Sequence, residues 1–150
     1  MLKLLIGLTL ILSENAWTAD RLTIGPVEED LERSGGGCSL QLPREYANRE
    51  GNYIFISDFH ENALVSVNGL DTHLALVKSK GPDVKKRGQL GEHSAYSYAG
   101  DGIDVEVDYV VTGGCPPSNG SCKVTHYDAI LTVKRGKARK TVAARAVCGT

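Results

Sequence analysis

The segment Ile103-Asp-Val-Glu-Val-Asp-Tyr109 alternates apolar and acidic side chains without interruption. Successive side chains of a β-strand point to opposite faces, so the alternation places the apolar side chains on one face and the three carboxylates on the other. A period of two over such a stretch is typical of a half-buried strand. The segment therefore predicts an antiparallel sheet with one face toward a core.

Two further segments extend this strand into a three-stranded meander. Residues 123–134 predict a long strand in which Tyr127, Ala129, Leu131 and Val133 share a face. The chain turns at Arg135-Gly-Lys-Ala138, and residues 139–147 return beside the second strand. We expect residues 123–134 to pair with the acidic strand, because opposite charges across neighbouring strands stabilise a sheet.

Shorter β segments precede the meander. Residues 52–57 are rich in β-branched and aromatic side chains, and residues 63–67 and 73–77 flank Asn68-Gly69, a strong hairpin signal. The spacing after this turn pair allows a bulge or a four-residue loop. Residues 94–98 predict another strand. The whole pattern predicts an all-β fold, a single antiparallel β-barrel or sandwich of about seven or eight strands.

The N-terminal part differs from the rest. Residues 1–19 predict an export signal, because the apolar run Leu4–Leu12 is too short to span a bilayer but suits a secretory signal peptide. Residues 20–37 are expected to form a flexible leader, with a helix of at most one or two turns beginning near Pro26. Residues 38–150 then form the β domain. We expect it to be secreted or periplasmic after signal cleavage, with no membrane span in the mature chain.

Four cysteines in an exported domain predict two disulfides. We favour Cys115–Cys122, which brackets a tight reversal of the chain, and Cys38–Cys148, which ties the start of the domain to its last strand. Sequence alone leaves the other pairings open. Zinc is the alternative, but the Cys-x6-Cys spacing differs from that of zinc sites.

Composition and motifs argue against several functional classes. A net charge of −1 with few aromatic residues is unlike a nucleic-acid binder. The chain has no Gly-x-Ser-x-Gly, His-x-x-x-His or His-Glu-x-x-His motif. Carboxylates at Asp101, Asp104, Glu106 and Asp108 are weak candidates for a cation site, since a strand sets them in a row instead of around an ion. We therefore expect no cofactor and no enzymatic activity.

Two neighbouring segments are candidate binding surfaces. The connection over residues 79–93 is long and rich in lysine, and such loops are often functional. The segment that follows combines serine and tyrosine, which give adaptable contacts at low entropic cost. The candidate side chains are Lys85, Lys86, Arg87, Ser94, Tyr96, Ser97, Tyr98 and Asp101.

Residues 62–109 contain an Asn-Ala-x-Val-x-Val strand, a glycine turn, a Leu-x-Leu strand, a polar loop and a Ser/Tyr segment. This order resembles the small periplasmic β-barrel inhibitors of lysozyme, which place serine- and tyrosine-bearing loops into the cleft of the enzyme. The resemblance covers about a third of the chain, and the inserted loop and the second disulfide depart from that family.

These features predict a secreted or periplasmic non-enzymatic binding protein whose partner is another protein of the envelope or the extracellular space. Inhibition or neutralisation of a hydrolase is the most concrete form of this role. One alternative is a structural, envelope-associated domain that docks on a larger assembly through its leader or its basic loop. Another alternative is a small metal-dependent enzyme.

Overall fold

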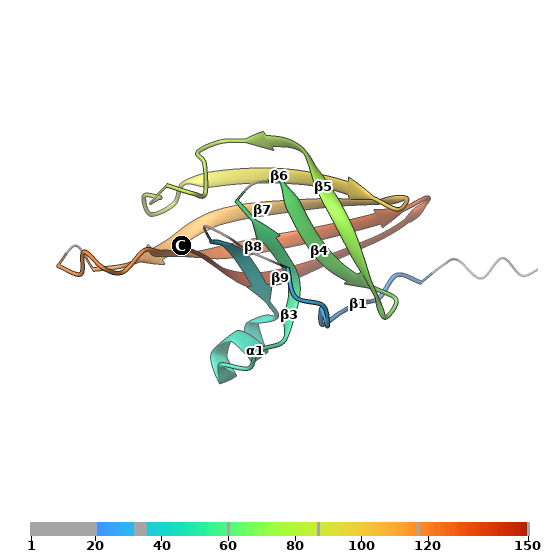
Figure 1. Cartoon of the computed structure of the whole chain (residues 1–150), viewed down its shortest axis with the longest axis horizontal. Helices are drawn as coiled ribbons and strands as arrows, with labels where there is room; N and C mark the ends of the chain where they lie inside the picture. Colours follow the sequence, from blue (N-terminus) through green and yellow to red (C-terminus); the bar gives the residue numbers. More distant parts are fainter. Residues whose placement is uncertain (1–20, 32–35, 60, 87, 117, 150) are drawn as a thin grey trace, which may run out of the picture.

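The computed structural model describes residues 21–31, 36–59, 61–86, 88–116 and 118–149, so the predicted export signal lies outside the described residues. Strands predominate within these ranges, and one short helix interrupts them (Figure 1). The predicted all-β class is confirmed. In chain order the elements are β1 (Ile24–Gly25), β2 (Gly37–Gln41), α1 (Pro43–Asn48), β3 (Tyr53–Asp58), β4 (Asn62–Val67), β5 (Leu70–Lys80), β6 (His93–Gly100), β7 (Ile103–Gly114), β8 (Val124–Arg135) and β9 (Ala138–Gly149).

Eight of these strands close into an antiparallel barrel. From β2 to β9, each strand pairs with the strand that follows it in the chain, and β2 also pairs with β9. Every barrel strand therefore has a hydrogen-bonded neighbour on both sides, which distinguishes the fold from a sandwich of two open sheets. The short β1 joins β4 at Ser66 and Val67, beyond Val65, where the pairing of β4 with β3 ends.

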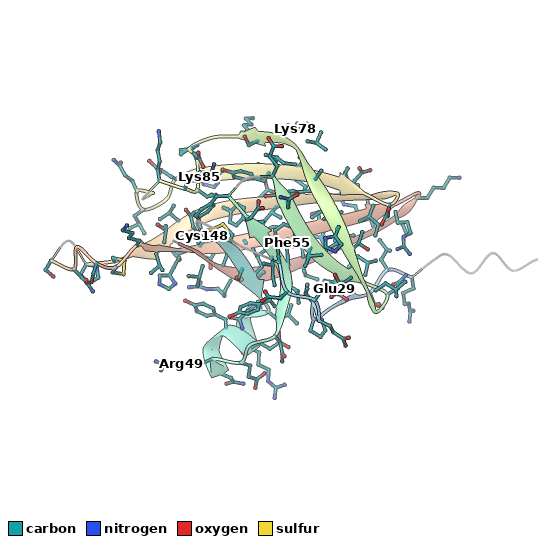
Figure 2. All side chains as sticks on the ribbon, in the orientation of Figure 1. Glu29, Arg49, Phe55, Lys78, Lys85 and Cys148 are labelled. Atoms are coloured by element: carbon teal, nitrogen blue, oxygen red, sulfur yellow. A yellow bond between two sulfur atoms is a disulfide. The ribbon has the colours of Figure 1, made fainter. Side chains whose placement is uncertain are left out.

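The interior of the barrel contains a continuous string of aromatic rings. Phe55, which lies near the middle of the barrel in Figure 2, contacts Tyr98. Tyr98 stacks on Tyr96, Tyr96 meets Tyr109 edge-on, and Tyr109 meets Tyr127, with ring centroids 5.3 to 6.5 Å apart. Such pairs contribute about 0.5–1.5 kcal/mol each beyond the area they bury. Valine and leucine side chains pack around them, so the interior is a filled core.

Two-residue turns connect three of the hairpins at one end of the barrel. They are Asn68-Gly69, Asp101-Gly102 and Gly136-Lys137. Asn68 and Asp101 have φ values of 53° and 50°, a region that short polar side chains tolerate better than most. The expected bulge or four-residue loop after Asn68-Gly69 is wrong, because Leu70 already pairs with Val67.

Both favoured disulfides are confirmed. Cys38 and Cys148 lie directly opposite each other across the pairing of β2 with β9, and their Cα atoms are 4.1 Å apart. Cys115–Cys122 closes the connection between β7 and β8, with Cα atoms 5.6 Å apart. All four sulfur atoms are bonded, so none of these cysteines is a free thiol that could hold zinc.

The predicted helix in the leader is wrong. Residues 26–31 form no helix, because backbone groups at their start bond to the barrel instead. The Val27 N–H donates to the Tyr53 carbonyl oxygen at 2.7 Å. The N–H groups of the next two residues donate to the Asp71 carboxylate at 2.7 and 2.6 Å. Leu22 is buried in the core, so the described start of the leader is fixed on the barrel and is not a flexible tail.

Removal of the Cys38–Cys148 disulfide is expected to lower the free energy of unfolding more than removal of Cys115–Cys122. The bridged cysteines are 110 and 7 residues apart in the chain. For loops of these lengths, the chain-entropy model gives about 5 and about 2.5 kcal/mol. Urea unfolding of Cys38→Ala/Cys148→Ala and of Cys115→Ala/Cys122→Ala measures both losses. Equal losses, or a larger loss for the second variant, would contradict the role of the first disulfide in closing the barrel.

The interior tyrosines are expected to make the protein less stable at alkaline pH. Burial raises the pKa of Tyr98 to about 12, and it also raises the pKa values of Tyr96, Tyr109 and Tyr127. The unfolded chain releases these protons near about pH 10. Between about pH 10 and about pH 12 the folded state therefore holds more protons, and the free energy of unfolding falls as the pH rises.

Urea unfolding from about pH 8 to about pH 12 measures this loss. The Tyr98→Phe variant lacks the titrating hydroxyl, so its free energy of unfolding should fall less steeply with pH than that of the parent. Identical slopes for the two proteins would mean that the Tyr98 hydroxyl is not buried in the folded state.

Candidate functional site

Three connections lie at the end of the barrel opposite the two-residue turns, whereas the connection after β2, residues 42–52 with α1, belongs to the end of those turns. In an antiparallel meander, the connections after β3, β5 and β7 lie at the same end, and here they are residues 59–61, 81–92 and 115–123. The loop after β5 and the tip between β7 and β8 project from the same side in Figure 1. Loops carried by a rigid sheet are a common location of binding residues. These three connections are called the loop end below.

The loop between β5 and β6 folds back over the mouth of the barrel. The Val84 N–H donates to the Tyr96 hydroxyl oxygen at 3.1 Å, and the Ser94 hydroxyl donates to the Pro82 carbonyl oxygen at 2.6 Å. Further along, two backbone hydrogen bonds of 2.9 and 3.0 Å join the loop to Val111 of β7. These bonds anchor a connection whose glycine and lysine content alone would favour a mobile loop.

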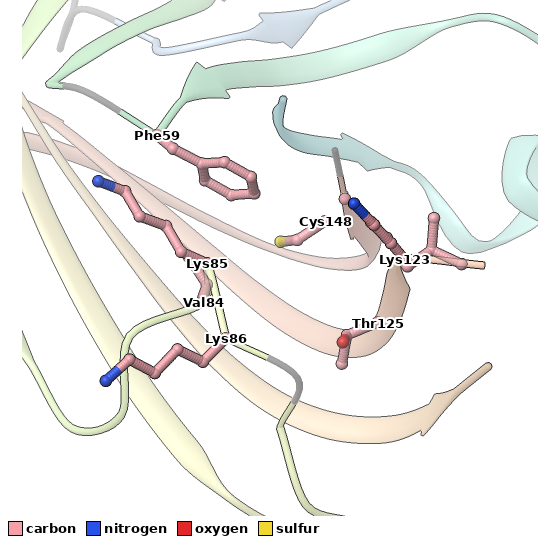
Figure 3. A pocket seen from close by; sticks show the side chains of 9 residues that line it. Phe59, Val84, Lys85, Lys86, Lys123, Thr125 and Cys148 are labelled. Atoms are coloured by element: carbon pink, nitrogen blue, oxygen red, sulfur yellow. The ribbon is translucent and has the colours of Figure 1, made fainter. Parts of the chain in front are cut away.

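A pocket of about 300 Å³ lies between this loop and the barrel (Figure 3). Phe59 from the connection after β3, Val84 from the β5–β6 loop and Cys148 from β9 give it apolar walls. Three lysines complete the lining, and no lining residue is acidic. The pocket is lined by Phe59, Val84, Lys85, Lys86, Lys123, Val124, Thr125, Cys148 and Gly149.

The structure divides the predicted binding residues among different places. Lys85 and Lys86 line this pocket, whereas Arg87 lies outside the described residues. Ser97 lies on the outer face of the barrel opposite Glu106. Asp101 lies in a two-residue turn at the end opposite the loop end, so the eight residues do not form one surface.

The expectation that Ser94, Tyr96 and Tyr98 form a recognition surface is wrong. Ser94 and Tyr98 are buried, and Tyr96 is half-buried. Cross-strand partners share a face of a sheet. These three residues pair with Tyr109, Val107 and Val105, which are the inward-facing residues of β7. Their role in this structure is to fill the barrel, and Tyr96 also anchors the loop above it.

Sequence reasoning did not bring Phe59, Val84 and Lys123 together, because they come from three separate connections. One signal was present in the loop: Val84 is the single aliphatic side chain between Gly81 and Gly88, apart from a proline. A lone aliphatic residue in a polar loop often packs against the body of a protein. The proximity of this loop to Lys123, at the end of the connection between β7 and β8, had no comparable signal.

The four carboxylates considered for a cation do not enclose one. Asp104, Glu106 and Asp108 stand in a row on the outer face of β7, and Asp101 lies in the turn before it. Across the strands Asp104 lies opposite Lys134, but the other two have uncharged partners. Burial, followed by the nearby Glu106 charge, raises the pKa of Asp108. Within the described ranges, no group of three or more His, Cys, Asp or Glu side chains is placed to hold a metal ion.

The connection between β7 and β8 forms a stapled tip, residues 115–122. The Cys115–Cys122 disulfide bridges its base. The backbone N–H groups of Asn119 and Cys122 donate to the carbonyl oxygens of Pro116 and Asn119 at 2.9 and 3.3 Å. The Ser121 hydroxyl donates to the Asn119 side-chain oxygen at 2.8 Å. A loop held in this way loses less conformational entropy when it binds a partner.

Comparisons with known proteins return no match: no protein-family model, no curated protein and no solved structure resembles the chain closely enough to be reported. Among the described residues, no helical segment has the length and apolar character of a transmembrane span. The function is therefore inferred from the geometry and charge of the loop end.

Loss of the Tyr96 hydroxyl is expected to loosen the β5–β6 loop while the barrel stays folded. Tyr96→Phe removes the acceptor of the half-buried Val84 N–H, and loss of such a hydrogen bond costs about 0.5–1.5 kcal/mol. The amide of Val84 should then exchange up to about tenfold faster in hydrogen-exchange NMR. Ser97→Ala, on the outer face of the same strand, is the matched control. Unchanged protection of Val84 in Tyr96→Phe would show that the loop is held by something else.

Proposed function

We propose that this chain is a non-enzymatic binding protein that acts in the periplasm or outside the cell, where it blocks the cleft of a hydrolase. The observation that carries the proposal is the asymmetry of the barrel. One end has three hairpins with two-residue turns and the connection that carries α1, and the other has the disulfide-stapled tip and the anchored β5–β6 loop. Two disulfides support an oxidising compartment.

The stapled tip is the element of the loop end best suited to enter a cleft. It projects beyond the body of the barrel in Figure 1, and its disulfide and internal hydrogen bonds fix its shape. Inhibitors that present a pre-formed loop bind tightly because little order has to be created on association. The two long strands β7 and β8 support the tip from below.

The lysines of the pocket favour a partner with an acidic cleft. Lys85, Lys86 and Lys123 line the pocket, and neither of the two ion pairs among the described residues involves them. Glycoside hydrolases carry a pair of carboxyl groups in the cleft. Complementary charge speeds association. Together with the resemblance of residues 62–109 to lysozyme inhibitors, this makes lysozymes the first enzymes to test.

The side chains around the pocket support binding more than catalysis. The lining has no histidine and no carboxylate that could act as a general base. Its one sulfur atom, on Cys148, is bonded to Cys38 and cannot act as a nucleophile in that state.

Inhibition of lysozyme by the oxidised protein tests the proposal. Clearing of a peptidoglycan suspension is followed with lysozymes of several structural types, and at least one is expected to be inhibited in a saturable way. Replacement of residues 115–122 by Asn-Gly should abolish inhibition, because it removes the tip and leaves a short hairpin turn. Full inhibition by this variant would exclude the tip as the blocking element, and no inhibition of any lysozyme would contradict this choice of enzyme.

Charge reversal at the loop end should slow association. Lys85→Glu/Lys86→Glu is expected to lower the association rate with the inhibited lysozyme about tenfold at low salt, and less at high salt. The matched control is Lys134→Glu/Lys137→Glu, which reverses two charges at the opposite end of the barrel. Equal rates for both variants, measured by surface plasmon resonance, would contradict an electrostatic role for the loop end.

A further inference from the structure

The pocket under the β5–β6 loop has apolar side chains in its lining that the protein-binding role does not use. Phe59 and Val84 pack against the hydrophobic core from outside the strands, and Cys148 belongs to that core. These three side chains come from different segments and meet at the mouth of the barrel (Figure 3). At about 300 Å³, the space is at the lower end of the volumes of small-molecule sites. The mouths of β-barrels are a common location of such sites.

The rim of the pocket is cationic. In Figure 3, Lys123 lies beside Cys148, Lys85 runs along Phe59 with its amino group pointing away from Cys148, and Lys86 extends away from the pocket. No carboxylate lines the pocket, and none of the three lysines takes part in an ion pair among the described residues. The rim therefore offers positive charge that an incoming anion can neutralise.

Lysines supply charge without fixing the geometry of the anion. Lysine presents a point charge on a flexible stem, in contrast to the planar fork of arginine, which matches carboxylates and phosphates bidentately. The lysines of the lining therefore suit an anionic head group whose orientation is set by the apolar part of the ligand.

We propose that this pocket binds a small amphipathic anion, a free carboxylic acid with a short apolar tail. The tail lies against Phe59, Val84 and Cys148, and the carboxylate lies at the rim between Lys85 and Lys123. This site is a function beyond the proposed inhibition of a hydrolase, and it does not depend on it, because the ligand is bound by the chain alone.

Titration with octanoate tests the site directly. Isothermal calorimetry is expected to show one site per chain, and NMR is expected to show shifts of the Val84, Thr125 and Cys148 amides. Acetate has the head group without the tail, and octylammonium has the tail with the opposite charge, so neither should bind comparably. Binding of octylammonium as tightly as octanoate would overturn the role of the lysines. The absence of octanoate binding at millimolar concentration would overturn the site.

Matched variants locate the bound head group. Lys85→Glu/Lys123→Glu is expected to weaken octanoate binding about tenfold or more, because two attractive charges become repulsive. Lys134→Glu/Lys137→Glu makes the same change of net charge at the opposite end and should leave the affinity unchanged. Lys123→Arg keeps the charge and should retain binding. An equal loss in both double variants would overturn the placement of the carboxylate at this rim.

A membrane surface carries the same combination of negative charge and apolar chains. Sedimentation with phosphatidylglycerol vesicles distinguishes binding to a membrane surface from binding of a free carboxylic acid. The pocket has a volume of about 300 Å³, which suits one small molecule, so we expect octanoate to bind and the vesicles to leave the protein in the supernatant. Binding to vesicles without binding of free octanoate would overturn the proposal in favour of a surface attraction. The results of the octanoate titration, of the charge variants and of the vesicle sedimentation do not depend on any inhibition of lysozyme.

Discussion

Seven of the eight pairings in the barrel join strands that follow each other in the chain, and the eighth, between β2 and β9, closes the sheet. In each of the seven local pairings, a short segment of chain joins the two strands. The eighth brings together residues 110 positions apart, at the largest cost in chain entropy. Cys38 and Cys148 lie directly opposite each other in this seam, so the disulfide joins the two strands at the most distant pairing of the fold.

The seam also determines where the binding elements lie. Cys38 is near the start of β2 and Cys148 near the end of β9, so the disulfide fixes the rim of the barrel at the loop end. Cys148 at the same time forms a wall of the pocket. From inside the barrel, the Tyr96 hydroxyl reaches the β5–β6 loop and holds Val84 over the mouth. Core, seam and loop are therefore linked by direct contacts, and Lys85 follows directly after the loop residue that Tyr96 holds.

Sequence reasoning succeeded where a local pattern determines the structure. The alternation in residues 103–109 and the composition of residues 123–147 predicted the three long strands, and the spacing of the cysteines favoured the pairing that the structure shows. It failed where distant residues compete. The helix expected near Pro26 does not form because the Asp71 carboxylate accepts the nearby backbone N–H groups. The register of β6 against β7 determines that Tyr96 points into the barrel. A short run of serine, alanine and tyrosine does not reveal that register.

Native-state hydrogen exchange of the oxidised protein tests most directly whether the whole barrel depends on the β2–β9 seam. If it does, the amides of the seam become accessible only when the barrel unfolds as a whole, with the same opening free energy as the amides of β7 and β8. If the amides of β2 and β9 exchange by local opening while those of β7 and β8 remain protected, the hairpins are stable without closure of the barrel, and the central role of the seam is contradicted.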